Sequence, residues 1–209
     1  KQLKRKRIFD LIFTVPALIL LAPLFLVVAV VIKCDDRGPV FFLQERVGYR
    51  GKKFLLWKFR SMGQTAKILG SASSPNSGPG QLTVGEDPRI TRAGRWLRRT
   101  KIDELPQLIN VLKGEMSLVG PRPEVPRYVA LYTEEQRQVL ELVPGITDPA
   151  SIKYRRESEL LALSSDPERT YIEQIMPDKI KINLDYARQA NLLTDFKIIL
   201  NTLCLVLKG

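Results

Sequence analysis

The sequence predicts a mixed α/β fold that is mostly helical, contains one short β-hairpin and follows a kinked membrane helix at its N-terminus. Three observations predict it. A long uncharged run lies near the start of the chain, two apolar and aromatic segments flank a glycine-containing turn, and several short segments end at glycine or proline. The length of 209 residues fits one domain with an appended membrane segment. We therefore expect a re-entrant helix hairpin over residues 1–36 and a cytoplasmic domain at the membrane interface over residues 37–209.

The first element is the apolar run over residues 11–32, which has no charged side chain and only Thr14 as a polar one. As a straight helix it would span about 33 Å, so a spanning helix fits its length as well as a re-entrant one. Basic residues precede and follow the run, and positive charge marks the cytoplasmic side of a membrane. Pro16 and Pro23 interrupt it. These features favour a helix that kinks at Ala22 and Pro23 and keeps both ends cytoplasmic.

The second element is a β-hairpin. Residues 40–46 and Lys53–Phe59 are apolar and aromatic, and two glycines lie between them within residues 48–51. This arrangement is typical of two antiparallel strands joined by a short loop. Residues 70–80 consist of Gly, Ser, Pro, Asn and one Ala, so we expect a mobile loop there.

The remaining elements are predicted to be short helices. Residues 93–99 form a basic amphipathic segment that suits a helix against anionic headgroups. Further helices are expected over residues 105–112, closed by Gly114, and over residues 134–143. Residues 192–207 are apolar but contain several polar side chains. We expect this last segment to pack on a core or to lie in the membrane interface.

The charge balance predicts an anionic partner. The chain has 33 Lys and Arg residues against 22 Asp and Glu, a net charge of +11, which suits nucleic acid, anionic lipid or phosphorylated substrates. It has no histidine, which excludes Ser-His-Asp and Cys-His catalysis and the commonest metal ligand. Catalysis would therefore use carboxylates, Lys, Arg, Tyr or an oxygen-bound cation. Cys34 and Cys204 are the only cysteines, and we expect both to be reduced.

The most informative segment is residues 98–107, where Asp103 and Glu104 stand side by side among basic residues just before a predicted helix. Two interpretations fit. Asp103 could cap the helix, with Glu104 stabilised in the first turn by the helix dipole. The second interpretation is compatible with the first: a helix N-terminus favours phosphate binding, and a carboxylate kept ionised there could attack a phosphorus atom and form an acyl phosphate. Mg²⁺ bridging the carboxylate and the phosphate would then remove the repulsion between two anions.

Arg122 is a candidate for binding phosphate. It lies between Pro121 and Pro123, which hold the backbone extended and present the guanidinium from a stiff support. Arg suits bidentate contact with phosphate, although an ordinary surface arginine in a proline-rich turn fits as well. Lys58 and Arg60 alternate with apolar residues on the second predicted strand. They predict either a solvated strand face or a cleft lined for phosphate.

In their order along the chain, these segments resemble the bacterial sugar transferase family, the monotopic polyprenol-phosphate phosphoglycosyl transferases that start cell-surface glycan assembly. The basic N-terminus with its proline-interrupted apolar run comes first. It is followed by FLQERVG at 42–48, KFRSM at 58–62, DPRITR at 87–92, DELPQL at 103–108, NVLKGEMS at 110–117, GPRP at 120–123 and PGIT at 144–147. Each motif alone is weak, but the ordered set is very specific.

The resemblance implies a two-step, ping-pong mechanism. Asp103 would be the nucleophile on the β-phosphate of a nucleotide-diphosphate sugar, with a UDP-sugar as the expected donor and UMP as the first product. Asp103 and Glu104 would hold Mg²⁺. Polyprenol phosphate, expected to be undecaprenyl phosphate, would then take the phospho-sugar from Asp103 and become a polyprenol-diphosphate sugar.

The resemblance also implies the binding residues and the location. Arg122 would contact phosphate beside Pro121, and Asp195 lies where relatives tend to carry an acid. The further anion-binding candidates are Lys58, Arg60, Arg89 and Arg98. The chain would lie in the bacterial inner membrane, kinked at Ala22 and Pro23, with its catalytic domain on the cytoplasmic face against the phospholipids. It would initiate exopolysaccharide, O-antigen, capsule or glycoprotein assembly.

After Thr147 the sequence departs from the family pattern, and Asn183 stands where an acid is expected, which leaves sugar recognition open. Two other functions fit the charge: a membrane-bound scaffold or nucleic-acid-binding protein without catalysis, and a Mg²⁺-dependent phosphatase that uses water on lipid diphosphates. The chain has no recognisable nucleic-acid motif, so we expect no nucleic-acid partner. The sugar, the nucleotide, the glycan pathway and the oligomeric state stay open.

Overall fold

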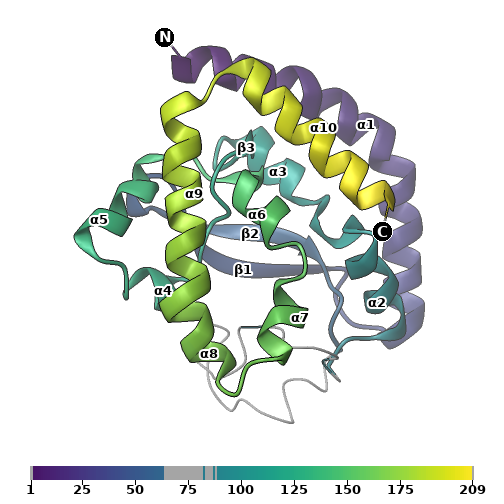
Figure 1. Ribbon diagram of the computed structural model, residues 1–209. Coiled ribbons are helices and arrows are strands. Elements are labelled where there is room, and N and C mark those ends of the chain that lie inside the picture. Colours follow the sequence, from purple (N-terminus) through teal and green to yellow (C-terminus); the bar gives the residue numbers. More distant parts are fainter. Residues whose placement is uncertain (1, 64–81, 83–86, 88, 209) are drawn as a thin grey trace.

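A computed structural model describes residues 2–63, 82, 87 and 89–208 (Figure 1). A short β-hairpin lies at the centre, and helices from the rest of the chain surround it. The predicted fold class, mostly helical with a short hairpin and an apolar N-terminal helix, is confirmed. The loop predicted over residues 70–80 lies outside the described residues.

The N-terminal helix α1 runs without interruption over Gln2–Asp36 and contains both Pro16 and Pro23. In Figure 1 it crosses the top of the molecule and then descends along one side. It is long and apolar enough to cross a membrane, and it is the one helix of this kind in the described part of the chain. The helix has no break at Ala22 or Pro23, so the re-entrant path stays a prediction.

Both ends of α1 pack on the same domain. Near the start, the Arg7 guanidinium donates a hydrogen bond of 2.7 Å to the carbonyl oxygen of Leu112. At the other end, the Asp35 carboxylate accepts one of 3.2 Å from the backbone N–H of Ala93. Much of the apolar surface between these ends is exposed, and Leu20 is the extreme at 78%. Such an exposed apolar surface marks a site for lipid or another protein.

The hairpin consists of β1 (Phe41–Val47) and β2 (Lys53–Phe59), which pair antiparallel with Phe41 opposite Phe59. The 3₁₀ turn η1 (Tyr49–Gly51) joins the strands, and Gly51 adopts a φ of 73° that favours glycine. The predicted hairpin is confirmed, shifted by one residue at its start.

The helix α3 (Gln107–Lys113) is fixed to β2 by one buried side chain. The amide of Asn110 accepts a hydrogen bond of 3.0 Å from the backbone N–H of Trp57 and donates one of 2.7 Å to the carbonyl oxygen of Leu55. It thereby satisfies two backbone groups of β2 as a neighbouring strand would. The residue after Trp57 is Lys58, so this bond also fixes the position of a predicted site residue.

The other elements are short. The predicted helix over 93–99 is α2 (Arg92–Arg99), the one over 105–112 is α3, and the tail is α10 (Leu192–Lys208). The remaining helices are η3 (Ile102–Glu104), α4 (Pro126–Val129), α5 (Glu134–Arg137), η4 (Gln138–Glu141), α6 (Pro149–Lys153), α7 (Glu157–Ala162), α8 (Pro167–Thr170), the π-helix η5 (Tyr171–Ile175) and α9 (Met176–Gln189).

Two details differ from the sequence-based prediction. The helix expected over residues 134–143 is α5 followed by the 3₁₀ turn η4, because Leu142 turns to extended backbone two residues before Pro144. A second, parallel pair of strands, β3 (Ser117–Val119) and β4 (Gly145–Thr147), was not predicted. Three-residue strands leave too little alternation in a sequence to be recognised.

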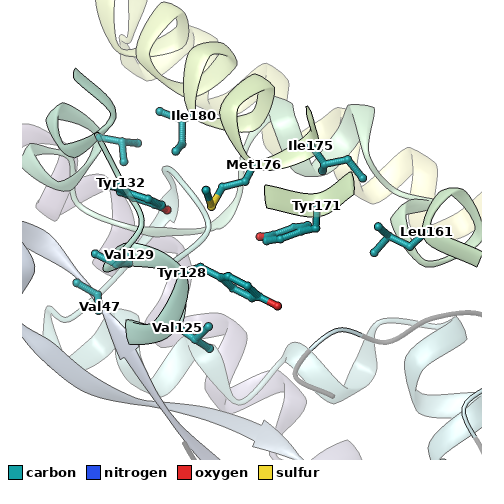
Figure 2. Packing of buried hydrophobic residues seen from close by; sticks show 11 residues of the cluster. Val47, Val125, Tyr128, Val129, Tyr132, Leu161, Tyr171, Ile175, Met176 and Ile180 are labelled. Carbon is teal, nitrogen blue, oxygen red and sulfur yellow. The ribbon is translucent and has the colours of Figure 1, made fainter. Parts of the chain in front are cut away.

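The core has separate clusters. The largest joins α4, η5 and α9 around the buried rings of Tyr128, Tyr132 and Tyr171 (Figure 2). A second cluster packs Val28 and Ile32 of α1 against the hairpin and α2. The C-terminal half of α1 is therefore part of the domain core on one face and exposed on the other.

We expect Gly94→Ala to destabilise the protein. Alanine in a helix is normally about 1 kcal/mol better than glycine, but a Cβ at position 94 would lie 1.9 Å from the carbonyl oxygen of Ser61. The clash involves backbone, so α2 would have to move, and we expect a net loss of about 2 kcal/mol in unfolding free energy. Gly63→Ala is the control, because its Cβ would meet nothing closer than 3.6 Å. Thermal unfolding in detergent measures both; equal stability of the two variants would contradict this packing.

Candidate active site

Asp103 and Glu104 lie on the 3₁₀ turn η3 between α2 and α3. The turn follows Lys101, whose φ of 57° is in the left-handed region and reverses the chain. Asp103 does not cap α3, because the N-cap position is Pro106 and no side chain caps the helix. The capping interpretation is therefore wrong. The Asp103 carboxylate is 7% exposed, and its Oδ1 atom has no hydrogen-bond donor among the described residues.

The neighbouring carboxylate of Glu104 is fully paired. The Arg122 guanidinium donates to both of its oxygens, with 2.9 Å between Nη1 and Oε2, and Lys58 Nζ lies 3.3 Å from Oε1. Burial alone would raise the pKa of Glu104, but the charges of Arg122 and Lys58 outweigh it and hold that pKa well below its usual range. Glu104 is thus an ionised anchor for two cations.

Asp103 has the opposite electrostatics. Burial, and then the negative charge of Glu104, raise the pKa of Asp103 to about 6. Lys58 partly opposes this rise, and burial lowers its own pKa to about 8. The pKa of Arg122 is raised, chiefly by Glu104. At neutral pH the site therefore holds Glu104 paired with the cations Arg122 and Lys58, and beside it Asp103, one oxygen of which has no hydrogen-bond donor among the described residues.

These groups open into one large cavity of about 2230 Å³. Its volume exceeds the roughly 300–1,000 Å³ of a typical small-molecule site, so two substrates can be accommodated. The cavity lining includes the following predicted site residues: Lys58, Arg60, Arg89, Arg98, Asp103, Glu104, Pro121 and Arg122. The structure thus brings together residues that are up to 64 positions apart in the chain, from 58 to 122.

Some predicted residues have protein partners in this cavity. Arg60 is paired with Asp36 at the end of α1, which ties this helix to the segment that follows β2. Arg89 pairs with Asp87, with 2.9 Å between Nε and Oδ1. Both arginines still line the cavity, so an anionic substrate would compete with these carboxylates for them.

Asp195 is not brought to the cavity. Its buried carboxylate accepts hydrogen bonds from Lys6 of α1 and from the Tyr186 hydroxyl of α9. Figure 1 shows α10 meeting α1 near the N-terminus. This arrangement gives Asp195 a role in joining three helices, and its substrate-binding role stays a prediction. Asn183, by contrast, lines the cavity, and its buried Oδ1 has no hydrogen-bond partner in the described residues.

Three residues at the site were missed by the sequence-based prediction. Arg46 donates a hydrogen bond of 3.0 Å to the carbonyl oxygen of Pro123 and also pairs with Glu124. Tyr171 donates from its hydroxyl to Glu124. The sequence held a signal for two of them, because Arg46 lies in the motif at 42–48 and Glu124 directly follows the motif at 120–123. It held no signal for Tyr171, which lies in the segment that departs from the family pattern.

Asp103 and Glu104 fit the protein part of a Mg²⁺ site. Mg²⁺ is usually held by one or two carboxylates together with substrate phosphates and water. The unpartnered oxygen of Asp103 is an available ligand, whereas Glu104 is shared with Arg122 and Lys58. The described residues contain no cluster of three or more acidic, His or Cys side chains that would hold a metal alone. Phosphate oxygens would have to complete the ligand set.

Comparison with known proteins identifies the family. The family of bacterial sugar transferases matches this chain over residues 1–209. The chain belongs to the bacterial sugar transferase family. It is 41% identical to an undecaprenyl-phosphate glucose phosphotransferase from Komagataeibacter xylinus. The match covers 204 residues, which are 95% of this chain and 35% of that protein. It is 36% identical to a UDP-N-acetylgalactosamine-undecaprenyl-phosphate N-acetylgalactosaminephosphotransferase from Aeromonas hydrophila, over 98% of this chain and 44% of that one.

A shorter relative is similar in size to this sugar transferase. A putative undecaprenyl-phosphate N-acetylgalactosaminyl 1-phosphate transferase from Bacillus subtilis is 40% identical over 151 residues, 72% of this chain and 75% of that protein. The chain spans less than half the length of the first two relatives. The family match over residues 1–209 confirms the predicted family.

Asp103→Asn should stabilise this sugar transferase at neutral pH when a chelator removes divalent cations. The pKa of Asp103 is about 6 in the folded state against 3.8 for an ordinary Asp. The stability that protonated Asp103 contributes is therefore present at acid pH and lost as pH rises through about 6. The amide removes this penalty, so we expect the unfolding free energy to rise by about 1–3 kcal/mol at pH 7.5 and to stay unchanged at pH 4.

Thermal unfolding at both pH values measures this difference. Glu104→Gln is the matched control, since it leaves two partly buried cations without their carboxylate and should destabilise the protein at pH 7.5 by about 2 kcal/mol. A stability gain from Asp103→Asn that does not depend on pH would contradict the raised pKa.

Proposed function

We propose that this protein transfers a sugar 1-phosphate from a UDP-sugar to undecaprenyl phosphate. The observation that carries the proposal is the buried carboxylate of Asp103, whose Oδ1 has no hydrogen-bond donor among the described residues, beside Glu104, Arg122 and Lys58 in a large cavity. The printed names of the relatives support the reaction, because they contain undecaprenyl phosphate as acceptor and either glucose or N-acetylgalactosamine as sugar. The two sugars make UDP-glucose and UDP-N-acetylgalactosamine the first donors to test.

The first step is the attack of a carboxylate oxygen of Asp103 on the β-phosphorus of the UDP-sugar. A bond forms between that oxygen and the β-phosphorus. The bond from the β-phosphorus to the bridging oxygen breaks, and UMP leaves with the electron pair. The phospho-sugar is then held on Asp103 as an acyl phosphate. In the second step an oxygen of undecaprenyl phosphate attacks the same phosphorus, the aspartyl oxygen leaves with its electron pair, and the carboxylate is restored.

The surrounding residues suit these steps. A pKa of about 6 leaves Asp103 ionised at neutral pH, and burial without a hydrogen-bond donor keeps its oxygen available as a nucleophile. Arg122 and Lys58 supply positive charge where the transferred phosphoryl group would lie. When bound by Asp103 and Glu104, Mg²⁺ would neutralise phosphate charge and so reduce the repulsion from Asp103.

We also propose that α1 is a re-entrant membrane helix in the bacterial inner membrane, with the domain on the cytoplasmic face. Arg7 at one end and Asp35 at the other contact the same domain, and the apolar surface between them is exposed. A helix with both ends on one domain keeps both on the same side of the membrane. The basic helix α2 and the apolar face of α10 would lie against the phospholipids. The product would start the assembly of a surface glycan.

UMP release tests the reaction. With undecaprenyl phosphate, Mg²⁺ and the correct UDP-sugar we expect continuous release, and without the lipid we expect about one UMP per enzyme together with sugar bound to the protein. Asp103→Asn should lower both by about 10³-fold or more, because the nucleophile is lost. Asp178→Asn is the control, since that carboxylate pairs with Lys153 outside the cavity. Continuous release without the lipid would instead indicate a phosphatase, and release that survives in Asp103→Asn would rule out the aspartyl intermediate.

Cysteine labelling tests the path of α1. Cys34 is exposed near its C-terminal end, and Lys4→Cys in a Cys34→Ser, Cys204→Ser background marks the other end. A membrane-impermeant maleimide should label both positions in inverted vesicles and neither in intact spheroplasts. Leu20→Cys in the same background should stay unlabelled in both, as a residue buried in lipid. Labelling of only one end from the outside would indicate a spanning helix.

A further inference from the structure

The backbone beside Arg122 is held by Arg46, a partly buried arginine of β1. The carbonyl oxygen of Pro123 accepts a hydrogen bond of 3.0 Å from Arg46 Nη1, and the same guanidinium lies 3.3 Å from Glu124. Pro121 and Pro123 already restrict the backbone dihedrals on both sides of Arg122. The hydrogen bond from Arg46 also fixes the orientation of the peptide unit between Pro123 and Glu124.

Glu124 is held in turn by two donors. Its Oε1 accepts a hydrogen bond of 2.8 Å from the backbone N–H of Val125, and its Oε2 accepts one from the Tyr171 hydroxyl. Its own carbonyl oxygen accepts a hydrogen bond of 2.9 Å from the N–H of Val47, which joins it to the strand that carries Arg46. Glu124 therefore has its carboxylate orientation set from outside the hairpin, with Oε1 held by the Val125 backbone and Oε2 by the Tyr171 hydroxyl.

Tyr171 reaches Glu124 from the segment that departs from the family pattern. It is 3% exposed and begins the π-helix η5, an uncommon conformation that is often found at functional sites. Burial, and then the charge of Glu124, raise the pKa of the Tyr171 hydroxyl well above its usual value, so the phenol stays protonated and remains a donor. A buried hydroxyl is normally hydrogen-bonded, and the partner of the Tyr171 hydroxyl is Glu124.

We propose that Tyr171 is a positioning residue for Arg122, acting through Glu124 and Arg46. When the Tyr171 hydroxyl is present, Glu124 holds Arg46 against the carbonyl of Pro123, and Arg122 keeps its paired contact with Glu104. When it is absent, the carboxylate of Glu124 can turn, and the support of the Pro123 peptide weakens. The expected effect on the reaction rests on the proposed function, whereas the effect on Arg122 itself does not.

The contact of Tyr171 with Tyr128 supplies a matched control. The two rings pack with 5.0 Å between their centroids, and Figure 2 shows their hydroxyls pointing in different directions. Tyr171→Phe and Tyr128→Phe each remove one hydroxyl from the same packed pair. Only the first removes the hydrogen bond to Glu124. A general loss of packing would affect both variants alike.

A double-mutant cycle tests the proposal in the UMP release reaction. We expect Tyr171→Phe to lower the rate about tenfold, as the loss of a hydrogen bond to a charged group would, and Tyr128→Phe to leave it unchanged. In an Arg122→Ala background, Tyr171→Phe should have no further effect, because its effect passes through Arg122. Equal losses from Tyr171→Phe in both backgrounds would overturn the proposal.

A second readout does not require turnover. Phenylglyoxal modifies exposed arginines, and mass spectrometry can follow Arg122 and Arg60 in the same sample. Tyr171→Phe and Glu124→Gln should each raise the modification rate of Arg122 about threefold or more as its contact with Glu104 loosens, with Arg60 and the Tyr128→Phe variant unchanged. An Arg122 rate equal to that of the wild type would overturn the proposal. If the wild type releases no UMP, the proposed function fails and this measurement still decides the role of Tyr171.

Discussion

The repulsion between Asp103 and Glu104 is the constraint on which the site depends. Adjacent carboxylates on one buried turn cannot both be ionised cheaply unless cations compensate them. The fold compensates Glu104 more strongly, because Arg122 and Lys58 both contact it, whereas one oxygen of the more deeply buried Asp103 has no hydrogen-bond donor among the described residues. The result is an unequal pair, with the pKa of Glu104 lowered and that of Asp103 raised to about 6. A carboxylate that is ionised but poorly stabilised is suited to attack an electrophile.

The cations that compensate Glu104 come from two supports. Lys58 follows Trp57, whose backbone N–H donates to the buried amide of Asn110. Arg122 is carried by a proline-bounded segment that Arg46 supports at the carbonyl oxygen of Pro123. The hairpin thus contributes to both supports, since Lys58 belongs to β2 and Arg46 to β1. The hairpin is short, yet it supports both cations that contact the carboxylate of Glu104.

The helix α1 belongs to the same architecture. Its C-terminal half buries Val28 and Ile32 against the hairpin and α2, and Asp36 at its end pairs with Arg60 of the segment after β2. With α1 in the membrane as proposed, this packing would place the cavity next to the lipid surface. A soluble nucleotide-sugar and a lipid phosphate, the proposed substrates, could then meet there without either leaving its own phase.

The sequence by itself determined the family, the hairpin, the helices α2, α3 and α10, and the charged residues Lys58, Asp103, Glu104 and Arg122 that meet in the cavity. It could do so because apolar patterning, turn residues and ordered motifs are local properties of the chain. Only the tertiary structure showed that Asp103 is buried and does not cap α3, brought Arg46 and Tyr171 to the site, and gave Asp195 its partners on α1 and α9. Those outcomes depend on which side chains meet across long separations, and on how burial shifts a pKa, neither of which is written in a local pattern.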